Sequence, residues 1–524
     1  MISRSGGKFG VKNPHGGLNS NRVRAALYYA TKSRMGGRLN GKEPVLIILG
    51  QSNGVGVAPK SGAPTFLQGT ISKAEIWNDP DWDVLSCGST NQAADSSSFG
   101  PEMSLAYYYL RRSKAKKIRI IKHTVSNTSL NVGWKVSTGT NYADAKTKID
   151  AALATLTPGT YYIAGILWVQ GENDALSASV TASNNYPTNL TDLVTDLRTE
   201  YGSDVPFVIS QLGYVNRNSY YYQDNVREAQ NSVSAAMGNV KIIRTDDLTF
   251  NADVIHFGAD AQVSIGARAA GAFFDADSYV ENRPPAYSEI TLWIDPSTPN
   301  TCLDGSNVIV TPGNGVQTVL GRQKAPLCNV GQTTGAQKPT VTAGVLNGRQ
   351  GLVFDGSADN LSAATMNPSL LFGTTAGTIA IISKTSLDKA HTIIFINAGT
   401  NAIVNTATKW FQTGVRNNFF FDWANASGGR LTGTTGAVVG TADLHEFYRK
   451  SGNTAEVLRN GTSLGTGAST GTVASLTGTL RIGYDGSNYF NGALSEIVCW
   501  PRELTTLEKT QLRSYVNTKH GLTV

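Results

Sequence analysis

A serine at the end of an apolar run is the first residue whose position in this sequence suggests chemistry. Residues 45–49 are all apolar and lead into Gly50-Gln51-Ser52-Asn53, so Ser52 stands where a predicted buried strand breaks into a turn. In an open parallel sheet such a break lifts a side chain clear of the sheet and exposes backbone N–H groups, which suits a nucleophile. A Gly-rich turn that caps a helix is the alternative interpretation.

A histidine far along the chain has the spacing expected of a partner for this serine. A serine hydroxyl is a weak nucleophile and needs a base, a task that imidazole suits. His256 follows Asp253 by three residues in a polar loop, and a carboxylate there can hold the imidazole in one tautomer. We assign Ser52 as nucleophile, His256 as base and Asp253 as the orienting acid. A surface or capping histidine, or Glu172 or Asp246 as the orienting acid, are the alternatives.

The elements that must position these residues form an alternating pattern. Apolar runs at 45–49, 118–125, 162–168, 205–210 and 240–243 alternate with helical stretches near 141–156, 187–201, 219–237 and 258–274. A further helix is predicted from Pro101, because proline suits the first helical position. Strands that alternate with helices predict an α/β fold, a three-layer parallel sheet with helices on both faces.

Four blocks of the sequence resemble the SGNH hydrolase superfamily, in the branch of sialate O-acetylesterases and plant-type acetylxylan esterases. They are Gly50-Gln51-Ser52-Asn53, the segment around Gly100, the run Trp168-Val169-Gln170-Gly171-Glu172-Asn173-Asp174, and Asp253-Val254-Ile255-His256. The resemblance implies an SGNH/flavodoxin-like serine esterase without a cofactor. It assigns the oxyanion hole to the backbone N–H groups of Ser52 and Gly100 and the side-chain amide of Gln170, each donor contributing on the order of 3 kcal/mol.

One block departs from the family. Relatives often carry a Gly-rich turn after the second strand, whereas residues 126–131 here are Ser-Asn-Thr-Ser-Leu-Asn, with Trp134 nearby. We expect this segment to line the substrate cleft, so the substrate that bears the acyl group cannot be carried over from relatives. The other residues expected at the cleft are Gln51, Asn53 and Glu172. Glu172 and Asp174 are also expected to brace loops.

Length and composition limit the classes of protein to consider. A chain of 524 residues predicts two or three domains, and 40% hydrophobic residues with 55 Gly and 16% charged residues exclude a disordered chain. The four cysteines show no CxxC spacing, so no metal site is predicted. We expect free buried thiols, with at most a bridge between Cys302 and Cys328.

The net charge of +7 comes from a basic leader. Residues 1–42 contain nine Lys or Arg and no Asp or Glu, and subtracting these nine charges from +7 leaves −2 for the remainder. A solvated flexible arm is expected, with docking to a partner assembly, a nucleic acid or an anionic surface as alternatives. No apolar run has signal-peptide length or the 18 residues needed to span a bilayer, so membrane insertion is not expected.

A second basic cluster lies at residues 111–122. It predicts a solvated helix end and strand entry, and nucleic-acid binding is not expected because aromatic residues are not interleaved with the charges. The adjacent His123 is expected to be a packed core or rim residue. The members of the cluster are Arg111, Arg112, Lys114, Lys116, Lys117, Arg119 and Lys122.

Composition changes after Arg283-Pro284-Pro285. The remaining chain is rich in Gly, Thr, Ser and Asn, with short strands predicted at 378–382, 392–396 and 480–483, and this pattern predicts a β-sandwich. Asn460-Gly461 predicts a hairpin turn, and Thr505 with Glu508 has capping-box spacing for a terminal helix to residue 520. Residues 292–295 and 353–356 resemble a concanavalin A/laminin-G-type jelly roll, which implies carbohydrate binding or a structural, trimer-forming role.

The sequence therefore predicts three regions: a basic leader at 1–42, an SGNH esterase domain at 43–283 and a jelly-roll sandwich at 286–524. The combination resembles bacteriophage tail fibres or tailspikes that deacetylate host glycans. We expect a carbohydrate O-acetylesterase acting on an acetylated polysaccharide, in a virion, with a possible homotrimer and tail docking through the leader. A bacterial carbohydrate esterase exported by a signal-independent route and a lectin-like, receptor-binding adhesin with an idle SGNH scaffold are the alternatives.

Overall fold

The structure is a computed structural model of the chain. The predicted basic leader lies outside the described residues except for its last two positions. Among the helices that can be described, none combines the length and apolar character needed to cross a bilayer. The described residues are 41–274, 278, 282–323, 328–366, 373–386, 393–397, 405–408, 418–422, 430–434, 439–468, 478–484, 486 and 488–524.

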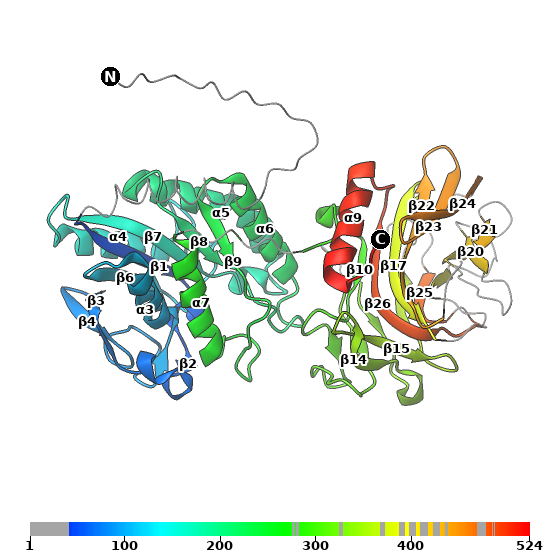
Figure 1. Ribbon diagram of the computed structural model, residues 1–524, viewed down its shortest axis with the longest axis horizontal. Helices are drawn as coiled ribbons and strands as arrows, with labels where there is room; N and C mark the ends of the chain where they lie inside the picture. Colours follow the sequence, from blue (N-terminus) through cyan, green and yellow to red (C-terminus); the bar gives the residue numbers. More distant parts are fainter. Residues whose placement is uncertain are drawn as a thin grey trace, which may run out of the picture.

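The first domain is built on a twisted sheet whose centre is β1, as predicted for the run at 45–49 (Figure 1). The strand order is β4-β3-β6-β1-β7-β8-β9, and neighbours are parallel except for the edge strand β4, which is antiparallel to β3. The strands are β1 (Glu43–Gly50), β3 (Thr70–Asn78), β4 (Asp81–Ser86), β6 (Ile118–Thr124), β7 (Tyr161–Val169), β8 (Phe207–Ser210) and β9 (Val240–Ile243).

Helices cover both faces of this sheet because alternate residues of β1 point to opposite sides. Leu46 and Ile48 pack with α3 and α7, whereas Val45, Ile47 and Leu49 pack with α4, α5 and α6. The predicted three-layer α/β fold is therefore confirmed. The helices are α2 (Ser52–Val55), α3 (Pro101–Ser113), α4 (Thr140–Ala154), α5 (Val180–Tyr201), α6 (Gln223–Ala236) and α7 (Ala259–Ala272).

The hairpin of β3 and β4 was not predicted from the sequence. Its residues mix charged and apolar side chains, and a third of them are exposed because the hairpin lies at the edge of the sheet. An edge strand lacks the continuous apolar run by which buried parallel strands are recognised. Helix α5 also begins seven residues earlier than predicted, at Val180, and contains Pro187 within its first two turns.

The second domain contains two main antiparallel sheets and the short antiparallel pair β20 (Asn418–Asp422) and β21 (Arg430–Thr434), which confirms an all-β region after the α/β domain. The larger has the order β14-β15-β26-β17-β22-β23-β24, with β10 paired to β26, and the smaller has the order β11-β12-β13-β16-β25-β18-β19. The strands of the larger sheet are β10 (Leu292–Ile294), β14 (Thr340–Leu346), β15 (Arg349–Asp355), β17 (Gly377–Thr385), β22 (Ala442–Lys450), β23 (Thr454–Arg459), β24 (Thr462–Ala468) and β26 (Asn491–Trp500). Those of the smaller sheet are β11 (Cys302–Leu303), β12 (Thr318–Val319), β13 (Val330–Gly331), β16 (Leu361–Met366), β18 (Ile394–Asn397), β19 (Asn405–Thr408) and β25 (Gly478–Ile482).

Two layers of apolar side chains hold the sandwich together. One fills the space between the sheets, with Phe354, Phe447 and Ile497 among its members. The other lies between the outer face of the larger sheet and the terminal helix α9 (Thr506–His520), where Trp293 and Trp500 are wholly buried. The predicted strand at 392–396 begins in residues that lie outside the described chain, and β18 accounts for its described part.

Three local predictions for the second domain are confirmed. Asn460 and Gly461 connect β23 to β24 with φ of 49° and 78°, the left-handed region that such hairpin turns require. Thr505 and Glu508 form the reciprocal capping box at the start of α9. The cysteines are free and buried, so Cys302 and Cys328 form no bridge.

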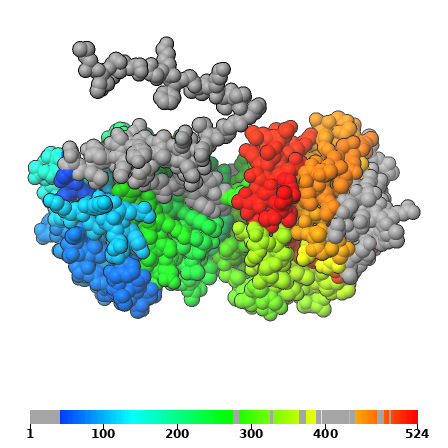
Figure 2. Space-filling model, viewed as in Figure 1, coloured from blue at the N-terminus to red at the C-terminus, as the bar shows by residue number. Residues whose placement is uncertain are grey.

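The two domains form lobes that meet along a seam beside α9 (Figure 2). Side chains from both domains interlock there: the Tyr214 hydroxyl accepts a hydrogen bond from Arg322 at 2.8 Å, and Asn300 donates to the Tyr214 carbonyl. Arg217 donates to the carbonyl of Gly321 at 3.3 Å. The loop after β8 is thus held against the sandwich.

Candidate active site

Ser52 stands directly after β1 because the chain turns sharply at Gly50. Gly50 has φ of 141°, and a Cβ at this position would lie 2.0 Å from the carbonyl oxygen of Val169 in β7. Only glycine permits so close an approach between the ends of β1 and β7. Ser52 is then the first residue of α2 and is 7% exposed, so its hydroxyl is held at the carboxyl edge of the sheet.

The structure brings the three predicted catalytic residues together from two distant segments. His256 Nε2 lies 3.0 Å from Ser52 Oγ, and His256 Nδ1 lies 2.7 Å from Asp253 Oδ2. Both distances are hydrogen-bond lengths. With the carboxylate accepting from Nδ1–H, Nε2 is left to accept the Ser52 proton; this tautomer is inferred from the partners. The arrangement supplies a nucleophile, a base and an orienting acid in contact.

Asp253 is held ready by its own loop. Its Oδ1 accepts from the backbone N–H groups of Ile255 and His256, each at 2.9 Å, while Val254 takes a left-handed φ of 54°. Burial alone would raise the pKa of Asp253, but these two N–H groups and the imidazole outweigh it and lower the pKa below its ordinary value. Asp253 is therefore an anion over the range in which an esterase works. Neither Glu172 nor Asp246 contacts the imidazole by hydrogen bond or ion pair in the structure as described; Asp246 instead pairs with Arg244.

Two of the three predicted oxyanion donors are engaged by other acceptors. The N–H of Gly100 donates to Glu102 Oε1 at 2.9 Å. Gln170 Nε2 lies 2.6 Å from Asp174 Oδ2 and 3.0 Å from the carbonyl of Thr128. Either group would have to exchange a bond to receive an oxyanion, so these two roles stay predictions.

The position of Lys122 differs from what the sequence predicted. Lys122 was expected on a solvated strand entry, but it is buried and its ammonium donates to Glu102 Oε2 at 2.8 Å and to the carbonyl of Val55 at 2.7 Å. Glu102 also accepts from Asn91 at 3.0 Å. This buried ion pair ties the end of α2 to the segment around Gly100. In the sequence, the only indication of this ion pair is a lysine at a core position of a strand.

The four residues expected to line the substrate cleft are buried instead. Trp134 packs edge to face against Trp168 with ring centroids 5.2 Å apart, so it belongs to the core beneath the loop. Gln51 accepts from Gln170 at 3.2 Å and links the first and third blocks. Asn53 and Glu172 bond to each other, 2.5 Å apart. These polar side chains support the loops around Ser52, and none presents a surface to a substrate.

The exposed edge near the triad is formed by other residues. Ser126 and Asn127, in the segment predicted to line the cleft, are exposed, and the carbonyl of Asn127 accepts from Asn173 at 2.9 Å. Tyr220, in the loop before α6, was missed by sequence reasoning. Burial, followed by the negative charges of Glu172 and Asp253, raises its pKa. A tyrosine in an irregular loop carries no signal in a single sequence.

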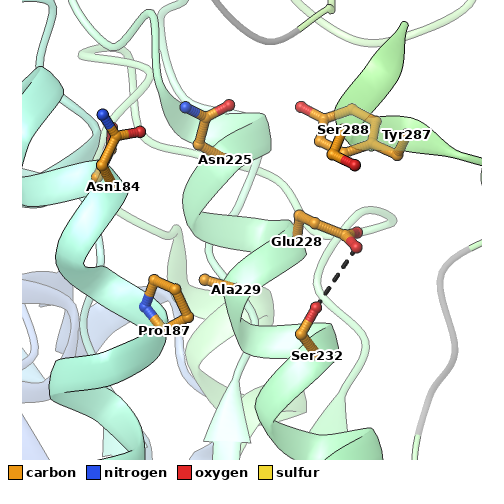
Figure 3. A pocket seen from close by; sticks show the side chains of 9 residues that line it. Asn184, Pro187, Asn225, Glu228, Ala229, Ser232, Tyr287 and Ser288 are labelled. Carbon is orange, nitrogen blue, oxygen red and sulfur yellow. Dashed lines mark hydrogen bonds between the residues drawn. The ribbon is translucent and has the colours of Figure 1, made fainter.

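A separate hollow lies between α5, α6 and the turn at Tyr287 (Figure 3). It has a volume of about 120 Å³ and contains none of the predicted catalytic residues. Asn225 and Glu228 of α6 face it across from Tyr287 and Ser288 (Figure 3). It therefore belongs to the domain seam. Among the residues that can be described, no cluster of three His, Cys, Asp or Glu side chains could hold a metal ion.

Three solved structures show what this chain is similar to. A protein from Arabidopsis thaliana has a TM-score of 0.38 and 20% identity over 44% of this chain and 98% of its own. NanS has a TM-score of 0.36 and 14% identity over 44% of this chain and 97% of its own. A carbohydrate acetylesterase from Xanthomonas citri has a TM-score of 0.31 and 14% identity over 76% of this chain and 74% of its own. No curated protein matches the chain.

The family comparison covers the domain that holds the triad. Residues 42–275 match the family described as "Carbohydrate esterase, sialic acid-specific acetylesterase". The matched segment begins at β1 and ends just after α7, so it includes Ser52, Asp253 and His256. With this match and the triad geometry, the α/β domain is a carboxylic ester hydrolase.

Proposed function

We propose that the α/β domain removes O-acetyl groups from a surface polysaccharide through an acyl-enzyme on Ser52. The observation that carries the proposal is the pair of contacts on one imidazole: Ser52 Oγ at 3.0 Å from Nε2 and Asp253 Oδ2 at 2.7 Å from Nδ1. The match of residues 42–275 to a carbohydrate esterase family supports the choice of an acetylated sugar over other esters.

In the first half of the reaction, Ser52 Oγ attacks the acetyl carbonyl carbon while its proton passes to His256 Nε2. The imidazolium that forms is stabilised by Asp253, and the oxyanion by the backbone N–H of Ser52, the first of the predicted oxyanion donors. The bond between the carbonyl carbon and the sugar oxygen then breaks. The sugar hydroxyl leaves with the proton from Nε2, and the acetyl group remains on Ser52.

In the second half, water replaces the sugar. His256 Nε2 takes one proton from the water as its oxygen attacks the acetyl-serine carbonyl, and the bond to Ser52 Oγ breaks as that oxygen regains the proton. Acetate leaves and the triad returns to its starting state. Both halves use groups of this chain and water.

The biological setting is a further part of the proposal. A basic leader, an esterase domain and a sandwich domain in one chain resemble bacteriophage tail fibres or tailspikes that modify host glycans. We place the protein in a virion as a homotrimer docked through residues 1–42, with an extracellular bacterial esterase as the alternative. Detection of the chain in purified virions by mass spectrometry would support this setting, and its absence from them would favour the bacterial one.

The activity is tested with two substrates. Wild type should hydrolyse 4-nitrophenyl acetate and release acetate from O-acetylated bacterial surface glycans, and Ser52→Ala should abolish both. Ser232→Ala, in α6 and outside the triad, is the matched control and should keep wild-type rates. Equal rates for wild type and Ser52→Ala would overturn the proposal. Retained glycan binding with no hydrolysis by any variant would favour the adhesin alternative.

A further inference from the structure

The residue beside the nucleophile holds the backbone on both sides of the catalytic histidine. Asn53 Oδ1 accepts from the N–H of Phe257 at 2.9 Å, and Asn53 Nδ2 donates to the carbonyl of Ile255 at 3.1 Å. Its own carbonyl accepts from Gln262 at 3.0 Å. The side-chain amide of Asn53 therefore straddles His256 and sets the distance between the imidazole and Ser52.

A buried glutamate from a third loop completes this clamp. Glu172, in the loop after β7, is 4% exposed, and its Oε1 accepts from Asn53 Nδ2 at 2.5 Å. Nδ2 of Asn53 donates to two acceptors and Oδ1 accepts from one donor, and these partners define the orientation of the Asn53 amide. Glu172 thereby fixes the orientation that lets Asn53 hold Ile255 and Phe257.

The bonding of Glu172 is unlike that of a structural carboxylate. Its Oε2 is buried and has no hydrogen-bond partner among the described residues. Glu102 is also buried, but it bonds Gly100 and Asn91 through Oε1 and Lys122 through Oε2. A buried polar atom without a partner costs about 1–3 kcal/mol. A group chosen for stability alone would satisfy both oxygens or be apolar.

Burial also raises the pKa of Glu172, and the hydrogen bond from Asn53 and the charge of His256 act against that rise. The groups around the carboxyl come from three loops: Asn53 after β1, Asp174 after β7, and His256 before α7. Of these, only Asn53 makes a hydrogen bond to the Glu172 side chain in the described structure. Any effect of Glu172 on the reaction must therefore pass through Asn53 or through its charge.

We propose that Glu172 is a positioning residue that acts through the Asn53 amide to hold His256 at proton-transfer distance from Ser52. The inference rests on the proposed function, because it concerns the same triad. It requires that the hydrogen bond from Asn53 to Glu172, rather than the negative charge of Glu172, keeps His256 in place. Glutamine keeps the acceptor toward Asn53 and places its NH₂ where Oε2 has no partner, so it should replace glutamate.

The test compares Glu172→Ala with Glu172→Gln in the full chain, with 4-nitrophenyl acetate as substrate. Glu172→Ala should lower kcat about 30- to 100-fold with KM changed less than about twofold, because a small misplacement of a catalytic group has an effect of this order. Glu172→Gln should keep kcat within about threefold of wild type. Glu446→Gln, a wholly buried glutamate in the sandwich, is the control and should keep the wild-type kcat.

A double-mutant cycle shows whether the effect passes through Asn53. Asn53→Ala should lower kcat by itself, and adding Glu172→Ala to it should lower kcat no further. Thermal unfolding of each variant reports folding separately, so a loss of kcat in a variant that melts at the wild-type temperature reflects positioning.

Three outcomes overturn the inference. They are an unchanged kcat in Glu172→Ala, a loss in Glu172→Gln as large as in Glu172→Ala, and additive losses in the double variant. In each of these the wild type remains an esterase and the proposed function stands. A wild type that hydrolyses no ester overturns the proposed function and, with it, the inference.

Discussion

The edge of the α/β sheet and the seam between the domains both gather charged side chains, but they pair them differently. At the seam, Asp295 accepts from Arg322 at 2.6 Å and Lys519 at 2.7 Å, and Glu496 from Lys519 at 3.1 Å and His520 at 2.6 Å, all buried. At the sheet edge, the side chains of His256 and Asp253 are 27% and 43% exposed.

This difference separates two uses of charge. A buried ion with two or more opposite partners resists any change in protonation, so this cluster on the sandwich side of the seam serves to stabilise the fold. The triad keeps one imidazole nitrogen facing a neutral hydroxyl, and this nitrogen can gain and lose a proton without breaking the fold. The comparison predicts that seam variants lose stability and that triad variants lose rate.

Removal of the base should have the largest effect. His256→Ala should lower kcat for acetyl ester hydrolysis about 10⁴-fold or more, because among the described residues no other side chain makes a hydrogen bond to Ser52 Oγ and could take its proton. The side chain is partly exposed and its removal leaves no buried ion, so the melting temperature should stay within about 2 °C of wild type. Stopped assays of acetate release measure kcat, and scanning fluorimetry measures the melting temperature. A large loss of stability would show that the triad also supports the fold.

Removal of a seam carboxylate should have the opposite signature. Asp295→Ala leaves Arg322 and Lys519 buried without their shared partner and should destabilise the sandwich by about 3–5 kcal/mol. Glu503→Ala, which breaks the partly exposed pair with Lys509, is the matched control and should cost less than about 1 kcal/mol. Denaturant unfolding measures both. Similar losses in the two variants would contradict the assignment of the seam as the stabilising cluster.

The buried carboxylates Asp295 and Glu496 should also make the stability of the fold depend on pH. Burial would raise the pKa values of Asp295 and Glu496, but Lys519 and its neighbours outweigh it and lower them. A carboxyl whose pKa is lower in the folded than in the unfolded state stabilises the fold above its unfolded pKa of about 4. This stabilisation is lost as the pH falls through the pKa of the folded state. The melting temperature should therefore fall steeply only below about pH 4. A melting temperature that already falls steeply well above pH 4 would contradict the lowered pKa values of these two carboxyls.

Substitution of Asp359 should give the smallest change in stability, and this change should be a gain at neutral pH rather than a loss. Burial, with some help from the charge of Asp355, raises its pKa to about 6. An acid whose folded pKa is raised destabilises the fold as the pH rises from about 4 through 6. Asp359→Asn should remove this trend and slightly raise the melting temperature at pH 7. A melting temperature that falls at pH 7 would show that the hydrogen bond to the Asp355 N–H matters more than the charge.

Several features could be predicted because a local pattern carries them. The apolar run at 45–49 predicted the central strand, and Asn460-Gly461 and the Thr505–Glu508 spacing predicted a turn and a cap that the structure contains. The serine, histidine and aspartate were found because their chemistry limits the residue types that could serve. What failed was the placement of side chains. Lys122 was expected in solvent and Trp134 at the cleft, and both are buried.

The sequence by itself determined which residues could perform the chemistry and which strand would present the serine, because residue type and hydrophobic periodicity are local properties. The tertiary structure alone decided how far apart the loops lie and which donors are occupied. Gly100 and Gln170 are engaged by Glu102 and Asp174, and Asn53 spans the backbone around His256 from a position 203 residues away. Such contacts depend on where parallel strands end in space, and that distance is not encoded in any single segment.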